Sequence, residues 1–497
     1  MKVILSGYNI DTTVIKDALN AGIPQEKLTP EVISAAYARI SRNPAPVNEL
    51  RADALEEVAK ARKSNKNIIF GMGHHSVAEH SVFNFDIIDM SRLAIEELEH
   101  FRLCSFTEKS QRYITLDNDF VMPAELQGTP YEAELTGLLK DQAEIYALLH
   151  KTLHKRLKEK YPELLAKKSS ANMVDGWAKE DARYATLLCT SGQLGFTANA
   201  RNLELIIKRL NASRLQELRS LAKVFYDEAT AVAPSIFIFT DPSPFDTNTP
   251  VEMNRLASEL LNSADKVQNS STDVQLIYHT QNGDKKVAAS LLNSASQAGI
   301  SQCLDAVDSM NSDQLTSIFK TVLANMEFYD SPPREFKHAQ LTFEVSVSAA
   351  SYGQLKRHRM MSQTVQQYDP SLGLTIPQSI KDAGMEQQFT EHAAKAEKLF
   401  YKIKKDYPDA APYALTNAHR RKVLLTTNMR ELYHFSRLRE DAHAQWDIRI
   451  LAAEMRKEVE KVMPLSALLL CGKDSFVSRF EKIYGHRPKI DPAAHSK

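Results

Sequence analysis

Residues 78–85 of the chain read AEHSVFNF, and residues 336–343 read FKHAQLTF, an offset of 258 positions. Residues 100–107 (HFRLCSFT) are similar to residues 357–364 (RHRMMSQT) at the nearly equal offset of 257. Similar segments that recur in unchanged order and at nearly constant spacing indicate an internal repeat. The chain is therefore predicted to contain two copies of one module.

A third match shows where the two copies differ in length. Residues 197–206 (TANARNLELI) are similar to residues 426–435 (TTNMRELYHF), but the offset here is 229. The second copy is therefore expected to be shorter between its second and third matching segments.

The junction between the copies is predicted from its prolines. The stretch 233–250 contains Pro234, Pro242, Pro244 and Pro250, with Ser, Thr and Asp between them. Proline lacks a backbone donor and breaks helices. We therefore expect a Pro-rich linker at 233–250, a first module at 1–232 and a second module at 251–497.

The pattern of apolar residues predicts strands and helices in each copy. Residues 83–87 alternate between apolar and polar side chains, as a half-buried strand does. Residues 131–160 are strongly charged and are expected to form a helix, and helices are also expected at 202–210 and 215–231. Each module is therefore expected to have an α/β (α+β) fold, with a small mixed sheet and packed helices.

The composition of the 497 residues is that of a soluble globular protein. Hydrophobic residues make up 43%, and 62 basic residues balance 62 acidic ones, so no global charge attracts nucleic acid or an anionic membrane. The four cysteines are scattered, which favours reduced thiols over a disulfide framework. No signal-like segment or long apolar run is evident, so a cytoplasmic protein is expected.

The most distinctive short motif is Arg357-His358-Arg359, followed by Ser362. Three adjacent basic or titratable side chains cannot all face the same way on a regular helix. Arginine forks match the oxygens of phosphate and carboxylate, so the motif points to an anion site. The alternative is a solvated basic stretch that ends a helix, where cations interact well with the helix dipole.

A second basic segment follows near the end of the chain. Arg430 and His434 are four residues apart, as are Arg439 and His443, so each pair shares one face of a predicted helix. This is typical of a packed functional helix, and an exposed helix with salt bridges is the alternative. Residues 73–80 (GHHSVAEH) contain three histidines and one glutamate, but nothing nearby completes a ligand set, so we expect no metal site.

Arg-His-Arg-x-x-Ser followed by S-x-R-Y resembles the hallmark of the flavin-dependent thymidylate synthases, the ThyX family. The two parts of the hallmark are divided between the copies, as Arg357–Ser362 in the second and Ser110–Tyr113 in the first. Residues 179–184 (KEDARY) and 428–449 also resemble this family. The resemblance implies an FAD enzyme that converts dUMP to dTMP, with methylenetetrahydrofolate as carbon donor and NADPH as reductant. It also implies a homodimer with four modules, because family members are tetramers of single modules.

The resemblance further implies which residues bind the nucleotide. The expected dUMP ligands are Gln354, Arg357 and Arg439 in the second copy, and Glu108, Ser110, Gln111, Arg112 and Arg183 in the first. Arg439 is the expected catalytic residue, because it would stabilise negative charge that develops on the uracil. At the positions of the second-copy ligands, the first copy has Glu97, His100 and Leu210.

The expected flavin contacts come from both copies. They are Ser76, Glu79, Glu108, Asn199 and Arg201 in the first copy, and Arg357, His358, Arg359, Asn428, Arg430 and His434 in the second. In the second copy, Arg334 and Lys337 replace Ser76 and Glu79.

Each copy thus keeps one side of the family's nucleotide site and has lost the other. The second copy has Val365, Gln367 and Asp369 where the first has its signature tail, and its upstream Arg is ambiguous between Arg420 and Arg421. We hypothesise that the two copies together make one composite nucleotide site. The alternatives are a related flavoenzyme for another pyrimidine nucleotide, and a non-catalytic flavin- or nucleotide-binding homologue.

Overall fold

The computed structural model describes residues 1–15, 27–40, 43–71, 73–112, 119–261 and 272–490. It divides into two compact units. Unit 1 comprises Met1–Val267 and Asp382–Leu415, and unit 2 comprises Gln268–Lys381 and Thr416–Lys497. Unit 1 therefore includes a segment that, by sequence, belongs to the second copy.

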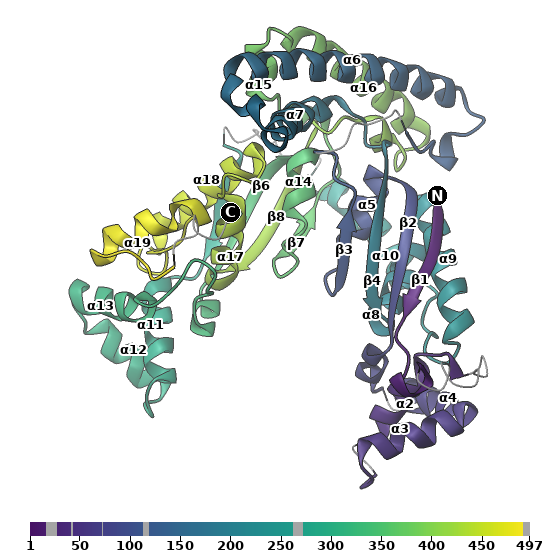
Figure 1. Cartoon of the computed structure of the whole chain (residues 1–497), viewed down its shortest axis with the longest axis vertical. Coiled ribbons are helices and arrows are strands. Elements are labelled where there is room, and N and C mark those ends of the chain that lie inside the picture. Colours follow the sequence, from purple (N-terminus) through teal and green to yellow (C-terminus); the bar gives the residue numbers. More distant parts are fainter. Residues whose placement is uncertain (16–26, 41–42, 72, 113–118, 262–271, 491–497) are drawn as a thin grey trace. The chain divides into compact units, whose positions relative to one another are not determined.

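Each unit contains one four-stranded sheet (Figure 1). In unit 1 the strand order is β1-β2-β4-β3, and in unit 2 it is β5-β6-β8-β7, which is the same order of corresponding strands. The strands are β1 (Lys2–Tyr8), β2 (Val82–Ser91), β3 (Cys104–Glu108), β4 (Ser191–Asn199), β5 (Val274–His279), β6 (Gln340–Ser348), β7 (Ser362–Val365) and β8 (Arg420–Asn428). The two identical orders confirm the predicted pair of modules. The sheets were expected to be mixed, but every pairing of these strands is antiparallel, so that expectation was wrong.

The helices of unit 1 that precede residue 262 include the three predicted at 131–160, 202–210 and 215–231. They are α2 (Glu31–Arg39), α3 (Val47–Glu56), α4 (Val58–Lys66), α5 (Arg92–Leu98), α6 (Pro130–Lys160), α7 (Lys168–Ala182), α8 (Ala200–Asn211), α9 (Gln216–Val232) and α10 (Pro244–Leu261). Short helical turns are η2 (Asn67–Gly71), η3 (His75–His80), η4 (Ala124–Leu126), η5 (Pro162–Ala166) and η6 (Arg183–Ala185).

Part of the expected Pro-rich linker is helical. Helix α10 begins at Pro244, where the missing amide proton costs nothing, and it continues through Pro250. Asp246 stabilises its first turn by accepting from the amide and hydroxyl of Ser243. The expectation that these prolines prevent a helix was therefore wrong for residues 244–250.

The elements of unit 2 repeat the same plan. Its helices and turns are α11 (Gly283–Ser294), α12 (Ile300–Asp308), α13 (Ser312–Leu323), η7 (Arg334–His338), α14 (Ala349–Leu355), η8 (Pro370–Leu372), α17 (Met429–Arg439), α18 (Trp446–Val462), η10 (Lys473–Ser475) and α19 (Phe476–Tyr484). Helix α15 (Gln378–Asp382) ends where unit 1 resumes, and α16 (Glu386–Asp406) and η9 (Ala411–Ala414) lie in unit 1.

Apolar alternation along the central strands builds the core of each unit. In β2, Phe83, Phe85 and Ile87 are buried, and Phe85 packs against Phe225 of α9 with ring centroids 4.7 Å apart. In β6, the buried side chains are Leu341, Phe343, Val345 and Val347. Burial of such side chains contributes about 1.5–3 kcal/mol each. The predicted strand at 83–87 is thus confirmed, and its buried side chains form part of the apolar face of the sheet.

Helices α6 and α16 lie side by side in unit 1 (Figure 1). Exposed ion pairs join them, with Lys395 to Asp141 at 2.6 Å and Lys402 to Glu134 at 2.5 Å. A buried hydrogen bond of 2.8 Å from the Tyr413 hydroxyl to Glu217 anchors the end of this segment to α9. The second-copy segment is therefore integrated into the packing of unit 1. No helix in the described parts of the chain is long and apolar enough to cross a membrane.

Candidate functional site

Two asparagines place the candidate helices at the ends of corresponding strands. Asn199 is the last residue of β4 and caps α8, because its side chain accepts a hydrogen bond of 3.0 Å from the backbone amide of Asn202. Asn428 is the last residue of β8 and caps α17, because its side chain accepts one of 2.9 Å from the backbone amide of Glu431. Asparagine is a strong helix N-cap. Both predicted flavin contacts therefore also have a structural role, since they begin the two candidate helices.

Arg439 ends α17 and is held by two side chains of unit 2. Its Nε donates to Nε2 of His358 at 2.8 Å, and its Nη1 donates to Oε1 of Gln354 at 3.1 Å. Gln354 lies on α14 and His358 lies in the turn before β7. Three residues predicted from separate motifs are thus brought into direct contact.

The three members of the Arg357-His358-Arg359 motif differ in exposure. Arg357 is exposed, Arg359 is half-buried, and His358 is 3% exposed. Burial, reinforced by the nearby Arg439 and His434, holds the pKa of His358 well below its usual value. The imidazole is therefore neutral. Its unprotonated Nε2 accepts the hydrogen bond from Arg439, and the ring proton lies on Nδ1.

Arg430 and His434 both lie on α17, as the sequence predicted, but their contacts differ. The rings of His358 and His434 meet edge to face at 5.9 Å. Burial, together with Arg437 and Arg439, also lowers the pKa of His434. The Nε of Arg430 donates to the Pro332 carbonyl at 2.7 Å. Arg430 is thus fixed against the loop before η7, while His434 borders the His358 cluster.

Arg112 in unit 1 is paired with a carboxylate. Its Nε and Nη2 both approach Oε2 of Glu180, at 2.9 and 2.8 Å. The Ser110 hydroxyl accepts from the Arg112 backbone at 3.2 Å, Gln111 is buried, and Glu108 ends β3. Tyr113, the last residue of the S-x-R-Y match, lies outside the described residues. The signature tail therefore forms one local structure anchored on α7.

Arg183 and Arg92 complete a group of buried cations in unit 1. Arg183 follows α7, is buried, and its Nε donates to the Glu180 carbonyl at 3.3 Å. Burial lowers the pKa of Arg183, and the charges of Arg112 and Arg92 act in the same direction. Arg92 begins α5, is 5% exposed, forms an ion pair with Glu96 at 3.4 Å and was not predicted from sequence. The preceding Ser91 caps α5 and indicates only where the helix begins. A group of arginines with this repulsion suits an anionic ligand.

The remaining first-copy flavin candidates lie on η3 and α8. Glu79 and Arg201 are exposed and form an ion pair at 2.5 Å, and Ser76 is exposed on η3. The structure thus brings Glu79 and Arg201 together, and their contact with flavin stays a prediction.

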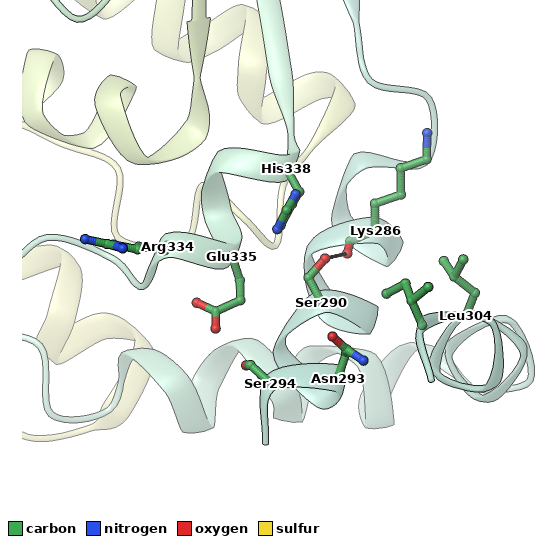
Figure 2. A pocket seen from close by; sticks show the side chains of 9 residues that line it. Lys286, Ser290, Asn293, Ser294, Leu304, Arg334, Glu335 and His338 are labelled. Atoms are coloured by element: carbon green, nitrogen blue, oxygen red, sulfur yellow. Dashed lines mark hydrogen bonds between the residues drawn. The ribbon is translucent and has the colours of Figure 1, made fainter. Parts of the chain in front are cut away.

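A pocket in unit 2 lies against η7, the counterpart of η3 (Figure 2). It has a volume of about 450 Å³ and is lined from α11, α12 and η7. Figure 2 shows Glu335 close to Ser294, whose hydrogen bond lowers the pKa of that carboxyl. Lys286, Arg334 and His338 are its basic lining residues. Because Arg334 stands where Ser76 stands in the first copy, this wall carries more positive charge than its counterpart.

The counterpart of Arg183 in the second copy is Pro412. The offset of 229 that relates Asn199 to Asn428 also relates Arg183 to Pro412, and the turns η6 and η9 correspond. Arg420 and Arg421 follow later and have other partners: Arg420 binds Asp273 at 2.6 Å, and Arg421 lies over the rings of Tyr352 and Tyr368. Neither replaces Arg183, so the second copy lacks this arginine.

Comparison with known proteins identifies the family. The sequence profile of Thy1, described as thymidylate synthase complementing protein, matches residues 25–235 and again residues 275–465. The two matches together span most of the chain, which therefore belongs to the Thy1 (ThyX) family. They also show that the chain carries two copies of the family's module.

Relatives of two sizes are similar to this chain. A UPF0159 protein of Chlamydia pneumoniae is 24% identical over 83% of this chain and 81% of its own length. A flavin-dependent thymidylate synthase of Clostridium tetani is 30% identical over 44% of this chain and 86% of its own length. Among solved structures, the UMP/dUMP methylase PolB of Streptomyces cacaoi, bound with 5-Br dUMP, is 19% identical. That match covers 39% of this chain and 92% of PolB, with a TM-score of 0.30.

Proposed function

We propose that this chain is a flavin-dependent thymidylate synthase that methylates dUMP to dTMP. Methylenetetrahydrofolate supplies the carbon, and NADPH reduces a bound FAD. Membership of the Thy1 family supports the reaction class. The observation that carries the proposal is the Arg439 guanidinium, held by His358 and Gln354 at 2.8 and 3.1 Å.

The held guanidinium suits stabilisation of negative charge on a uracil ring. Its Nε and Nη1 are oriented by neutral acceptors, so the positive charge of Arg439 is not cancelled by a carboxylate at either contact. A preorganised cation of this kind lowers the energy of an anionic transition state, and one such donor is worth about 3–4 kcal/mol. Arg439 is therefore the proposed catalytic residue.

The arginines of unit 1 are proposed to bind the phosphate of the nucleotide. Arg112 and Arg92 are close enough to Arg183 for their charges to affect it. Arg112 also forms an ion pair with the Glu180 carboxylate. A dianionic phosphate would relieve this repulsion. Glu108, Ser110 and Gln111 are proposed to act with them, and Gln354 and Arg357 are proposed as the ligands from the second copy. We propose that binding of dUMP depends on both sets.

A buried polar atom of His358 supports the proposal that a flavin binds here. With Nε2 of His358 accepting from Arg439, the proton lies on Nδ1, and this buried atom has no hydrogen-bond partner within the described residues. A flavin carbonyl or phosphate oxygen would supply the acceptor. The FAD would be held by His358, Arg357, Arg359, Asn428, Arg430 and His434, with Ser76, Glu79, Glu108, Asn199 and Arg201 from the first copy. When bound, it supplies the hydride chemistry that side chains cannot perform.

The first experiment measures cofactor and product on the purified full chain. A flavin absorption spectrum and a flavin-to-protein ratio come first, followed by bleaching with NADPH. The reduced protein is then given methylenetetrahydrofolate with dUMP, UMP or dCMP, and products are separated by mass spectrometry. We expect dTMP from dUMP. Methylation of UMP or dCMP alone would favour a related flavoenzyme, and loss of both flavin and product would favour a non-catalytic homologue.

A matched pair of variants ties the activity to the site. Arg439→Lys keeps the charge but cannot make both contacts to His358 and Gln354, so we expect a large loss of dTMP formation with flavin retained. Arg255→Lys changes an exposed arginine of α10 that pairs with Glu259, and we expect no loss. We also propose a homodimer, for which light scattering should give twice the mass of one chain.

A further inference from the structure

A cluster of metal-ligating side chains lies between α6 and α7, apart from every residue proposed above to bind nucleotide or flavin. His150 and His154 are four residues apart on α6, so they share one face of that helix. Their rings are nearly parallel, with an interplanar angle of 11° and centroids 5.7 Å apart. Two histidines in this spacing on one helix are a common zinc-binding arrangement.

Helix α7 brings a carboxylate to the two imidazoles. Oδ1 of Asp175 lies 2.7 Å from Nε2 of His150 and 3.8 Å from Nδ1 of His154. The three donor atoms all lie within 4.8 Å of one another. Zn²⁺ binds imidazole nitrogen and carboxylate oxygen at about 2.0–2.2 Å, which places its donor atoms roughly 3–4 Å apart. Small side-chain rotations therefore bring this set to the geometry of a bound ion.

The chemical types of the three side chains suit a metal. The cluster combines two imidazoles with one carboxylate. Imidazole nitrogen and carboxylate oxygen are donors that Zn²⁺ and other late transition metals bind.

We propose that His150, His154 and Asp175 form a site for a divalent transition-metal ion, Zn²⁺ being the natural occupant, that joins α6 to α7. The three side chains are 24–29% exposed, so an ion can enter and keep water on its remaining positions. Helix α7 continues to Glu180, the partner of Arg112. A metal at this place would hold the helix that positions Arg112. The proposed metal site does not depend on the proposed reaction with dUMP.

Lys179 makes the proposal testable in both directions. Its Nζ lies 2.7 Å from Oδ2 of Asp175, one turn along α7. The ammonium shares the carboxylate and repels a divalent ion, so it weakens the site. If the cluster served only as a hydrogen-bonded link between two helices, Lys179 would have no influence on metal affinity. Lys179→Met should therefore strengthen metal binding, and no folding defect can imitate that gain.

The experiment titrates Co²⁺ into chelator-treated full-length protein and follows its visible absorption, with Zn²⁺ added afterwards as competitor. Two further groups in the described residues contain potential ligands, one around His358 and one around His443. The number of ions bound is therefore compared between wild type and each variant, and the difference shows whether an ion binds at His150, His154 and Asp175. We expect His154→Gln and Asp175→Asn to lose one bound ion, or about tenfold or more in its affinity. Lys179→Met should tighten the same ion several-fold, and His486→Gln, an exposed histidine, should bind like wild type.

Thermal unfolding provides the second readout. Zn²⁺ should raise the Tm of wild type and Lys179→Met but not that of His154→Gln, since a ligand that binds only the folded state stabilises it. The metal-free Tm of His154→Gln checks that this variant is folded. Equal Co²⁺ binding by wild type, His154→Gln and Lys179→Met would overturn the proposal. Such a failure would leave the assignment of dUMP chemistry untouched, because no nucleotide residue is changed.

Discussion

The Nε atom of Arg439 donates a hydrogen bond of 2.8 Å to Nε2 of His358, a buried and neutral imidazole. A histidine from the Arg-His-Arg motif thus orients an arginine from the last motif of the chain. Both had been assigned to ligands, one to flavin and the other to nucleotide. The pair is therefore expected to couple the two functions.

Replacement of His358 should misplace Arg439. His358→Leu keeps much of the buried volume but removes the acceptor, so the guanidinium loses an orienting bond. Loss of a hydrogen bond to a charged group costs about 1.5–3 kcal/mol, or roughly tenfold to a hundredfold in dUMP affinity. His358→Gln places an amide oxygen near the position of Nε2 and should retain more of it. Calorimetric titration of dUMP measures both, and wild-type affinity in His358→Leu would contradict the orienting role.

The neutral state of His358 predicts a pH dependence of stability. Its pKa in the folded protein lies well below the usual value of about 6.5 that applies to the unfolded chain. Between these two values the unfolded chain binds a proton that the folded protein does not. Its contribution is therefore full above about pH 6.5 and is lost as the pH falls toward the folded pKa. Thermal melts from about pH 7.5 to about pH 5.5 should show a smaller decrease in Tm for His358→Gln than for wild type. An equal decrease in both proteins would refute this.

The complementary sets predict that dUMP binding fails when either is damaged. Arg112→Ala removes the cation paired with Glu180, and Arg439→Ala removes the one held by His358. Each lost charged contact is worth about 1.5–3 kcal/mol, so each variant should weaken dUMP binding roughly tenfold or more. Arg255→Ala, which removes an exposed ion pair, is the control. If both Arg112→Ala and Arg439→Ala bound dUMP like wild type, the composite hypothesis would be falsified.

The absence of a side chain at Gly472 is expected to be required for the backbone position next to Arg439. Glu440 directly follows Arg439 in the chain. A Cβ atom built on Gly472 would lie 2.7 Å from the carbonyl carbon of Glu440 and 2.8 Å from its carbonyl oxygen. Gly472→Ala must therefore displace this backbone, at about 1–3 kcal/mol. We expect a lower Tm and weaker dUMP binding. Gly299→Ala meets nothing within 4 Å and serves as the control; identical behaviour of the two variants would show that the close approach has no consequence.

Tyr413 tests the integration of residues 382–415 into unit 1. Its hydroxyl donates to Oε2 of Glu217 at 2.8 Å in a buried position, and this oxygen also accepts from Ser91. Tyr413→Phe leaves the carboxylate with one partner fewer, which costs about 1–3 kcal/mol. Hydrogen exchange should then speed up in residues 382–415 and in α9. Tyr226→Phe, at an exposed tyrosine, should change neither; unaltered exchange in Tyr413→Phe would mean that the segment is held by other contacts.

Much of the local structure was predictable because it depends on neighbouring residues. The alternation at Phe83, Phe85 and Ile87 records a strand with one buried face, and the structure confirms it. The linker prediction failed at residues 244–250 because Pro244 can begin a helix and Ser243 and Asp246 complete its first turn. The candidate residues Arg357 and Arg439 were found through motifs. Arg92 was missed because its burial beside Arg183 depends on packing that no short motif records.

The sequence by itself determined the repeat, the family and the two unequal sets of candidate residues. Each of these can be recognised from residue types and their spacing without knowledge of the fold. Only the tertiary structure decided that Asp382–Leu415 packs in unit 1, that His358 accepts from Arg439, and that Asp175 meets His150. The reason is physical: hydrogen bonds and burial between distant residues depend on how helices and strands pack, whereas a sequence pattern reports mainly on neighbours along the chain.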